Sequence, residues 1–322
     1  MRCRIARNKK LAWVGKSAET SGEKLDTPSE RPVVNQQTQK QSPIMAAFAP
    51  ERTGPASFRC ASVGDERRPV VFGGQIMGQM IAAAAMLEPG KRVKNLHTVF
   101  ARAGTVMQPV DYTLEQFHSG RAFGSIAAIA AQGDRVLSRG LLLMDAGEGD
   151  VIRHQVPQLA MSGPAMHGPA GHSEDPAVEI RVVDGIDMMT TQVTGDPEIG
   201  IWMRWRDVPE DPAMHQALLA WYTDPFLIAA AMRPHDGIGQ IQAHETLSTG
   251  VITHTLTFHE PFRADEWLLI ANRSQHAGGG RTYGDGHVFT EDGRLVASFV
   301  QTNMIRSFRE DGATRGRAEG AM

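Results

Sequence analysis

The sequence predicts an α+β fold in which one helix followed by an antiparallel sheet occurs twice. Each half of the chain has a strongly apolar helical segment, and four strand-like runs separated by turns follow each of these segments. A helix that is apolar on most sides is usually buried, and a curved sheet wrapped around it would bury it. The order of elements repeats at low sequence identity, which indicates an internal structural repeat.

Composition narrows the class of protein. The chain has 322 residues, enough for two domains, with 41% hydrophobic and 21% charged residues, which is typical of a soluble globular protein. The net charge of −3 predicts no strong attraction to nucleic acid or to a membrane surface. No apolar run approaches the roughly 20 residues that cross a bilayer. The two cysteines, Cys3 and Cys60, favour a reducing compartment, so we expect a cytoplasmic protein.

Residues 1–50 are expected to form a disordered N-terminal extension. Residues 1–16 are basic, and residues 17–42 are polar with almost no apolar side chains. Such a segment cannot bury enough surface to offset the entropy lost on ordering.

The first domain is expected at residues 55–148. The run VVFGGQIMG at residues 70–78 opens a helix through two glycines, and Pro89-Gly90 ends that helix. The strands expected after it are 93–103, 109–118, 122–132 and 135–144.

Residues 149–199 are expected to be a connector, because they are rich in Gly, Pro, His and Met and show little periodicity. His154, His167 and His172 lie in this stretch, too far apart to form a metal-binding pair on one helix.

The second domain is expected at residues 200–310, followed by a tail at residues 311–322. An apolar helix at 212–232 precedes strands at 244–258, 266–275, 281–290 and 295–305, and Glu291-Asp292-Gly293 forms a hairpin turn. A central helix wrapped by an antiparallel sheet is a hotdog arrangement, so the whole chain is predicted to be a tandem double hotdog.

Five motifs occur in a characteristic order. They are VFGGQIMGQ at residues 71–79, LHTVFARAG around His97, LAWYTD ending at Asp224, FHEPFRADEWLL at residues 258–269, and DGRLVASFVQ ending at Gln301. Together they resemble the acyl-CoA thioesterase II family of double-hotdog enzymes over roughly residues 58–306. The resemblance implies hydrolysis of a fatty acyl-CoA to free fatty acid and CoA, with no cofactor and no metal.

The resemblance also implies site residues. In the family an Asp, a Gln and a Thr or Ser jointly hold the attacking water, and these positions fall on Asp224, Gln301 and Val251. Val251 has no hydroxyl group. By strict alternation along a strand, Thr249 and Thr253 are expected to share its face and are the candidates to replace it.

The expected chemistry follows from the residue types. Asp224 would accept a proton from water, a role worth typically 10²–10⁴-fold in rate. Gln301 offers both a donor and an acceptor with which to orient that water. Backbone N–H groups would meet the developing oxyanion, either at the helix start formed by Gly73, Gly74 and Gln75, which are candidates for substrate binding, or near the second helix.

Each candidate residue also has a structural interpretation. Asp224 precedes Pro225 and is a candidate helix cap, and Gln301 is a candidate solvated strand residue. His97 is expected to be a core histidine. His254 and His259 are five residues apart on a strand, so they are expected to face opposite sides and not to share a metal.

Two other functions remain open from the sequence. Val251 in the water-holding set is compatible with a hotdog protein that binds acyl-CoA without hydrolysing it. An enoyl-CoA hydratase-like enzyme is the second enzymatic alternative, although Asp224 and His235 lack the spacing such enzymes need. No GxSxG, GxGxxG or Walker motif is present. Because an open sheet edge is a hazard unless covered, a homo-oligomer is expected.

Overall fold

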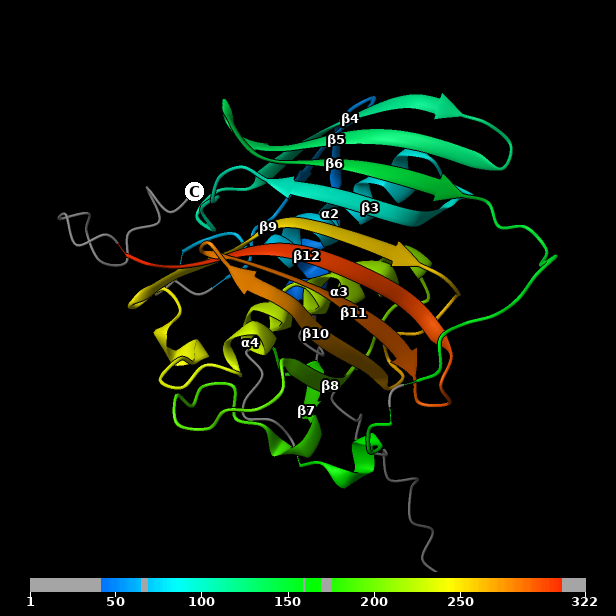
Figure 1. Cartoon of the computed structure of the whole chain (residues 1–322). Helices are drawn as coiled ribbons and strands as arrows, with labels where there is room; N and C mark the ends of the chain where they lie inside the picture. Colours follow the sequence, from blue (N-terminus) through cyan, green and yellow to red (C-terminus); the bar gives the residue numbers. More distant parts are fainter. Residues whose placement is uncertain (1–41, 65–68, 159, 169–174, 309–322) are drawn as a thin grey trace, which may run out of the picture. The chain divides into compact units, whose positions relative to one another are not determined.

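The computed structural model describes residues 42–64, 69–158, 160–168 and 175–308 (Figure 1). The N-terminal half contains α1 (Pro43–Ala47), β1 (Glu51–Gly54), β2 (Ser57–Cys60), α2 (Gly73–Leu87), β3 (Arg92–Phe100), β4 (Val110–Ser119), β5 (Phe123–Gln132) and β6 (Arg135–Asp145). The C-terminal half contains β7 (Val178–Val182), β8 (Glu198–Trp205), α3 (Pro212–Thr223), α4 (Phe226–Met232), β9 (Leu247–Phe258), β10 (Leu268–Gly278), β11 (Arg281–Thr290) and β12 (Leu295–Ser307).

The named strands of the described residues form one antiparallel sheet of 12 strands, in the order β1-β2-β4-β5-β6-β3-β9-β12-β11-β10-β8-β7. Both halves have the same strand order from the outer edge of the sheet to its centre. It is β1-β2-β4-β5-β6-β3 in the first half and β7-β8-β10-β11-β12-β9 in the second, so β1 corresponds to β7 and β3 to β9. In both halves the helical segment that packs against the sheet lies between the second and third strands along the chain, as α2 in the first half and as α3 and α4 in the second. The predicted α+β class is confirmed, and the strand order agrees with the predicted internal repeat.

The two halves meet where β3 pairs with β9. The three central pairs of this seam are Leu96 with Leu256, His97 with Thr255, and Thr98 with His254. Because the seam joins equivalent strands of the two halves, a pseudo-two-fold axis runs through its centre. Position 96 therefore corresponds to position 254, and position 98 to position 256.

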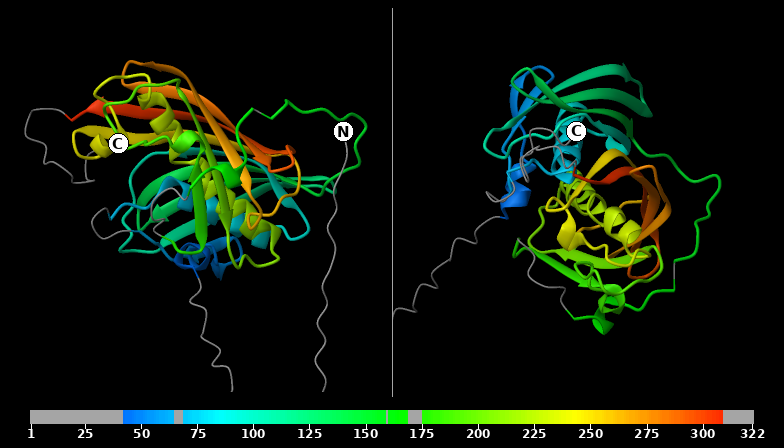
Figure 2. Two further views of the ribbon diagram at one scale, coloured as in Figure 1. Left: turned by 90° about the horizontal axis from the view of Figure 1, so that it is seen from below. Right: turned by 60° about the vertical axis from the view of Figure 1, so that its left-hand side comes forward.

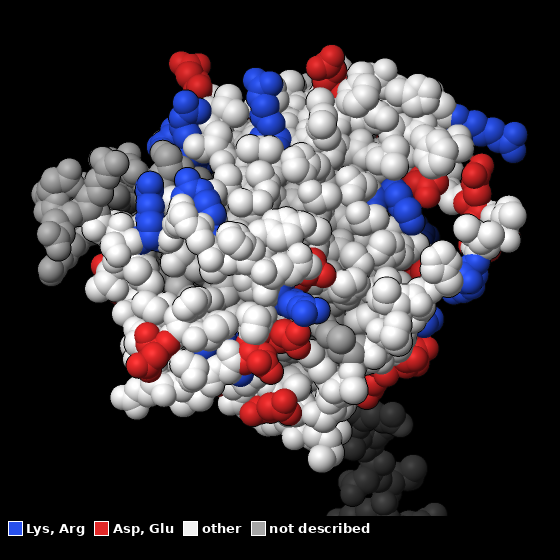
Figure 3. Space-filling view, viewed as in Figure 1, with Lys and Arg blue, Asp and Glu red and all other residues white. Residues whose placement is uncertain are grey.

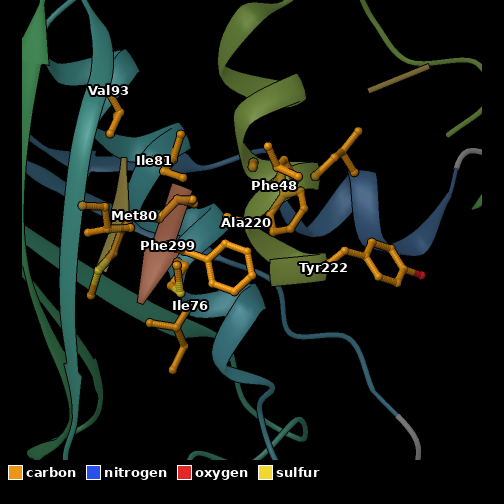
Figure 4. Close-up of a cluster of buried hydrophobic side chains, with 14 of the residues drawn as sticks. Phe48, Ile76, Met80, Ile81, Val93, Ala220, Tyr222 and Phe299 are labelled. Carbon is orange, nitrogen blue, oxygen red and sulfur yellow. The ribbon is translucent and has the colours of Figure 1, made fainter. Parts of the chain in front are cut away.

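Helices α2 and α3 pack against each other on one side of the sheet (Figures 1 and 2). Two glycines one turn apart on α2 make the close approach possible. A Cβ atom on Gly74 would lie 2.6 Å from the carbonyl oxygen of Trp221, and one on Gly78 would lie 3.1 Å from that of Ala217. Apolar side chains from both halves meet here in a single buried cluster (Figure 4).

The N-terminal extension expected to reach residue 50 ends earlier, because α1 is ordered and belongs to the core. Ile44, Met45 and Phe48 are buried, and Phe48 lies edge-on to Trp221 with ring centroids 6.1 Å apart. The fully buried Gln79 holds α1 in place by donating to the carbonyl of Ala47 at 2.9 Å. Residues 1–41 and the expected tail at residues 311–322 lie outside the described residues.

The stretch expected to be a connector contains β7 and the first residues of β8, so the second half begins before residue 200. Glu179 on β7 is held by Arg181 at 2.6 Å and Arg204 at 2.8 Å. These two guanidinium groups lower the pKa of Glu179 to about 2. His172 lies outside the described residues, among which no cluster of three His, Cys, Asp or Glu side chains is suited to a metal ion.

The helix expected at residues 212–232 is interrupted at Asp224 and Pro225, which separate α3 from α4. Both residues keep helical backbone angles, so the interruption follows from the missing N–H of proline, which cannot continue the helical hydrogen bonds.

In the part of the chain that the structure describes, no helix is both long and apolar enough to cross a membrane.

Replacing Phe48 by alanine should lower the free energy of unfolding by about 3–5 kcal/mol, because the ring is 2% exposed and fills the space over Gly78. Urea unfolding followed by circular dichroism measures this loss. Phe117, which is 60% exposed, provides the control, and Phe117→Ala should change the unfolding free energy little. A loss at Phe48 no larger than the small change expected at Phe117 would contradict this packing role.

Candidate active site

Asp224 lies where two helix ends meet. It follows the last residue of α3, and its carboxylate is next to Gly73, the first residue of α2. A Cβ atom on Gly73 would be only 3.0 Å from Oδ2 of Asp224, so glycine leaves the carboxylate its space. Asp224 is only 3% exposed. The interruption by Pro225 thus places a buried acidic side chain against the other half of the molecule.

Gln301 reaches the same point from the inner face of β12 and is fully buried. Its Nε2 donates to the backbone carbonyls of Thr223 at 2.8 Å and Asp224 at 3.1 Å. The last carbonyls of a helix have no intrahelical donor, so this amide satisfies the end of α3. The orientation of the Gln301 side chain follows, with Nε2 toward the helix end and Oε1 free to accept another hydrogen bond.

His254 is the residue of this cluster to which the sequence assigned no role. Its Nδ1 is 3.1 Å from Nε2 of Gln301 and 3.6 Å from Oδ1 of Asp224, and the ring is fully buried. Its Nε2 is 3.3 Å from Oγ1 of Thr223, a hydroxyl that itself donates to the carbonyl of Ala220. The Thr223 oxygen therefore accepts from His254, which makes Nδ1 an acceptor toward Gln301. The pairing of His254 opposite Gln301 explains the contact.

Two buried acceptor atoms in this cluster have no hydrogen-bond partner among the described residues. They are Oδ1 of Asp224 and Oε1 of Gln301. Buried polar atoms are nearly always hydrogen-bonded, and leaving them unpaired costs stability. Two such acceptors could each accept a hydrogen bond from one small molecule that has two protons to donate.

Few basic side chains lie near the carboxylate of Asp224. Among the described residues, His254 is the one basic side chain within 4 Å of its carboxylate. The start of α2 lies beside it, and a helix N-terminus carries a partial positive charge that stabilises a nearby anion. The N-cap residue, Phe72, makes no side-chain hydrogen bond to this helix end, so Asp224 lies beside an N-terminus whose first N–H groups receive nothing from their own cap residue.

The three residues predicted to bind substrate differ in position. Gly73 lies against Asp224, as described above. Gly74 faces the backbone of Trp221 and allows the two helices to approach. The buried Gln75 side chain accepts a hydrogen bond from the backbone N–H of Val63 at 3.0 Å, so it holds the segment that precedes α2. The structure brings only Gly73 next to the predicted aspartate.

Val251 does face the interior, but the expectation that Thr253 shares its face is wrong. A β-bulge at residue 252 makes Val251 pair with the buried Asn303, whereas Thr253 pairs with Thr302 on the other face. One extra residue in a strand reverses the alternation beyond it. Thr249 does lie on the inner side, where its hydroxyl is 3.2 Å from Nε2 of His244.

His97 is not a core histidine. It lies on the outer face of β3, where its Nδ1 is 2.7 Å from the hydroxyl of Thr255 across the seam. Because Thr98 and His254 point inward from the adjacent positions, His97 is on the opposite side of the sheet from Asp224.

Comparison with protein families identifies both halves. Residues 62–144 match the model of the acyl-CoA thioesterase N-terminal domain, and residues 154–305 match that of the C-terminal domain. The chain belongs to the acyl-CoA thioesterase II family. The predicted family and the predicted class of enzyme, a thioester hydrolase acting on acyl-CoA, are confirmed.

Individual relatives agree with this assignment. The chain is 28% identical over 262 residues to acyl-coenzyme A thioesterase 8 of Mus musculus, a match that covers 73% of this chain and 80% of that protein. The crystal structure of acyl-CoA thioesterase II TesB2 from Mycobacterium marinum is similar with a TM-score of 0.69 and 27% identity, over 82% of this chain and 98% of that one.

A protein of unknown function with a hot dog fold from Alicyclobacillus acidocaldarius shares the fold, with a TM-score of 0.65 and 19% identity over 83% of this chain and 98% of that one. A hotdog-type α+β fold is therefore shared with solved structures of this kind.

Replacing His254 by phenylalanine should lower kcat roughly tenfold or more and unfolding stability by about 1–3 kcal/mol, because Thr223 and Gln301 each lose a buried partner. Steady-state kinetics and urea unfolding measure the two effects. His97→Phe makes the same exchange on the outer face and should leave kcat unchanged. If both variants lose activity equally, the position of His254 inside the cluster has no special effect on turnover.

Proposed function

We propose that the protein hydrolyses acyl-CoA through a water molecule held by Asp224 and Gln301. One observation carries this proposal: Oδ1 of Asp224 and Oε1 of Gln301 are buried acceptors without partners in the described structure, and His254 contacts both side chains. A water can donate one proton to each of them. Its oxygen lone pairs then remain available for attack on the thioester carbonyl carbon.

The reaction proceeds in two balanced steps. The water oxygen bonds to the carbonyl carbon while Asp224 accepts a proton, which gives a tetrahedral oxyanion. The oxyanion then collapses, the carbon–sulfur bond breaks, and the proton on Asp224 passes to the sulfur, leaving a fatty acid and CoA. Thioesters lack the resonance stabilisation of oxygen esters, so a positioned water with a general base worth typically 10²–10⁴-fold is adequate.

The N–H groups of the first turn of α2 are suited to the oxyanion. The first N–H groups of a helix have no intrahelical acceptor, and the N-cap residue of this helix, Phe72, makes no side-chain hydrogen bond to them. Gly73 is the first residue of this helix, and a Cβ atom on it would lie 3.0 Å from Oδ2 of Asp224, the proposed base. The general base and the oxyanion site thus come from opposite halves of the chain.

We also propose that each half is one hotdog domain and that the chain is a tandem double hotdog. The repeated strand order and the pseudo-two-fold seam support this interpretation. The first domain would cover residues 55–148. The second would include β7 in addition to the residues from 200 to 310, with the remaining part of residues 149–199 as the connector.

A cytoplasmic homo-oligomer is the assembly that we propose. The outer face of the first half carries the exposed apolar side chains of Val99, Leu141 and Leu143, with the exposed Arg139 opposite Val99. Most of the surface seen in Figure 3 is uncharged. Exposed apolar groups of this kind mark association surfaces. Static light scattering of the purified chain tests the assembly.

Asp224→Asn should lower hydrolysis at least a hundredfold, because the amide keeps the shape of the side chain but cannot take the proton. Release of free thiol from hexanoyl-, decanoyl- and palmitoyl-CoA measures this, and the shift in melting temperature with each ligand measures binding. Asp111→Asn removes an exposed carboxylate paired with Arg59 and should leave the rate unchanged. Binding by the wild type with no thiol release would instead favour the acyl-CoA-binding protein that Val251 leaves open.

A further inference from the structure

We propose that Thr98, from the first half of the chain, supplies the hydroxyl that completes the water-holding set. It would replace the hydroxyl that Val251 lacks in the second half. This inference rests on the proposed function of Asp224 and Gln301.

Thr98 has a buried hydroxyl group that nothing in the described structure satisfies. The residue is fully buried on the inner face of β3, and its Oγ1 has no hydrogen-bond partner among the described residues. A buried unpaired hydroxyl is costly to a folded protein. Such a group in a native structure calls for an explanation in terms of function or an ordered water.

The neighbours of Thr98 connect it to the proposed base. Its partner across the seam is His254, whose ring is 3.6 Å from the Asp224 carboxylate. Cβ atoms of opposed residues in an antiparallel pair are about 4.5–5.5 Å apart. Phe100, the next inward residue of β3, comes within 3.2 Å of the Cβ position of Gly73, beside Asp224. Thr98 therefore stands between two side chains that both reach the surroundings of Asp224.

The pseudo-two-fold axis provides an internal comparison. The register of β9 with β12 places His254 opposite Gln301, and the register of β3 with β6 places Leu96 opposite Leu142. Leu96 therefore corresponds to His254, and Leu142 corresponds to Gln301. By the same axis, Leu256 corresponds to Thr98.

All six of these residues are buried. On the side of the axis away from Asp224 the three positions are leucines, and on the side near Asp224 all three are polar. Thr98 thus belongs to the polar set that includes His254 and Gln301, the two residues that contact Asp224. If these positions only had to pack, leucine would suit all six of them.

Other hydroxyl groups near the site are committed elsewhere. Thr223 donates to the carbonyl of Ala220 at 3.0 Å. Thr249 is within hydrogen-bond distance of His244, and Thr253 lies on the other face of β9 because of the bulge. The unpaired inward hydroxyl of Thr98 is the one that these contacts leave available.

The chemistry gives this hydroxyl a defined task. The water donates its two protons to Asp224 and Gln301, which leaves two lone pairs on its oxygen. If the Thr98 O–H donates to one of them, the other is the single lone pair that can attack. Thr98 would then fix the direction of attack while Asp224 takes the proton.

Four variants test this role. Thr98→Val removes the hydroxyl at constant shape, and Thr98→Ser retains it. Thr98→Val combined with Val251→Thr restores a hydroxyl on the inner face of β9. Thr255→Val removes a hydroxyl on the outer face of the seam as a control. kcat and KM are measured for each with hexanoyl-, decanoyl- and palmitoyl-CoA, together with melting temperature.

Thr98→Val is expected to lower kcat roughly tenfold to a hundredfold with KM nearly unchanged. Thr98→Ser should stay near the wild type, the double variant should recover most of the lost kcat, and Thr255→Val should change nothing. The melting temperature of Thr98→Val should hold or rise, because an unpaired buried polar group is removed. A merely structural threonine would not produce a kcat loss in a variant of undiminished stability.

The inference is overturned if Thr98→Val keeps kcat within about twofold of the wild type, or if Thr98→Ser loses as much as Thr98→Val. If Asp224→Asn abolishes turnover in the same series, the proposed function stands and only the role of Thr98 fails. If Asp224→Asn retains full turnover, the proposed function fails and this inference fails with it.

Discussion

The pairing of β3 with β9 is the constraint on which the rest of the structure depends. It joins the two halves into one sheet and sets the register at which their inner faces meet. With that register in place, α2 packs along α3, and the first residue of α2 lies against Asp224. Neither half alone contains the cluster, because Gly73 comes from one half and His254 and Gln301 from the other.

A buried carboxylate is costly unless its surroundings compensate for lost hydration. Among the described residues the compensation comes mainly from the partial positive charge at the start of α2, because the Gln301 amide donates to the backbone carbonyls at the end of α3 and not to the carboxylate. The anchoring leaves acceptor atoms unpaired in the interior, which lowers stability. Functional sites commonly retain such local costs while the remaining core supplies the fold's stability.

Long periodic elements were predictable from the sequence, whereas short ones and contacts between strands were not. The helix starting at Gly73 and the eight strands that follow the two helices lie within a few residues of the expected ranges, because each has a sustained apolar period. α1 and β7 have five residues each, too few for such a period. Asp224 and Gln301 were correctly expected to lie together, but His254 joins them through register, and the face of Thr253 depends on a bulge that alternation does not reveal.

The unequal seam has a consequence for how this molecule can evolve. In an assembly of two identical chains every position occurs twice, so any change near the axis alters both copies at once. Here Leu96 and His254 occupy equivalent places but are encoded separately. One place can be optimised for packing while the other keeps polar groups, so a single chain holds one polar cluster of this kind where a symmetric pair would hold two.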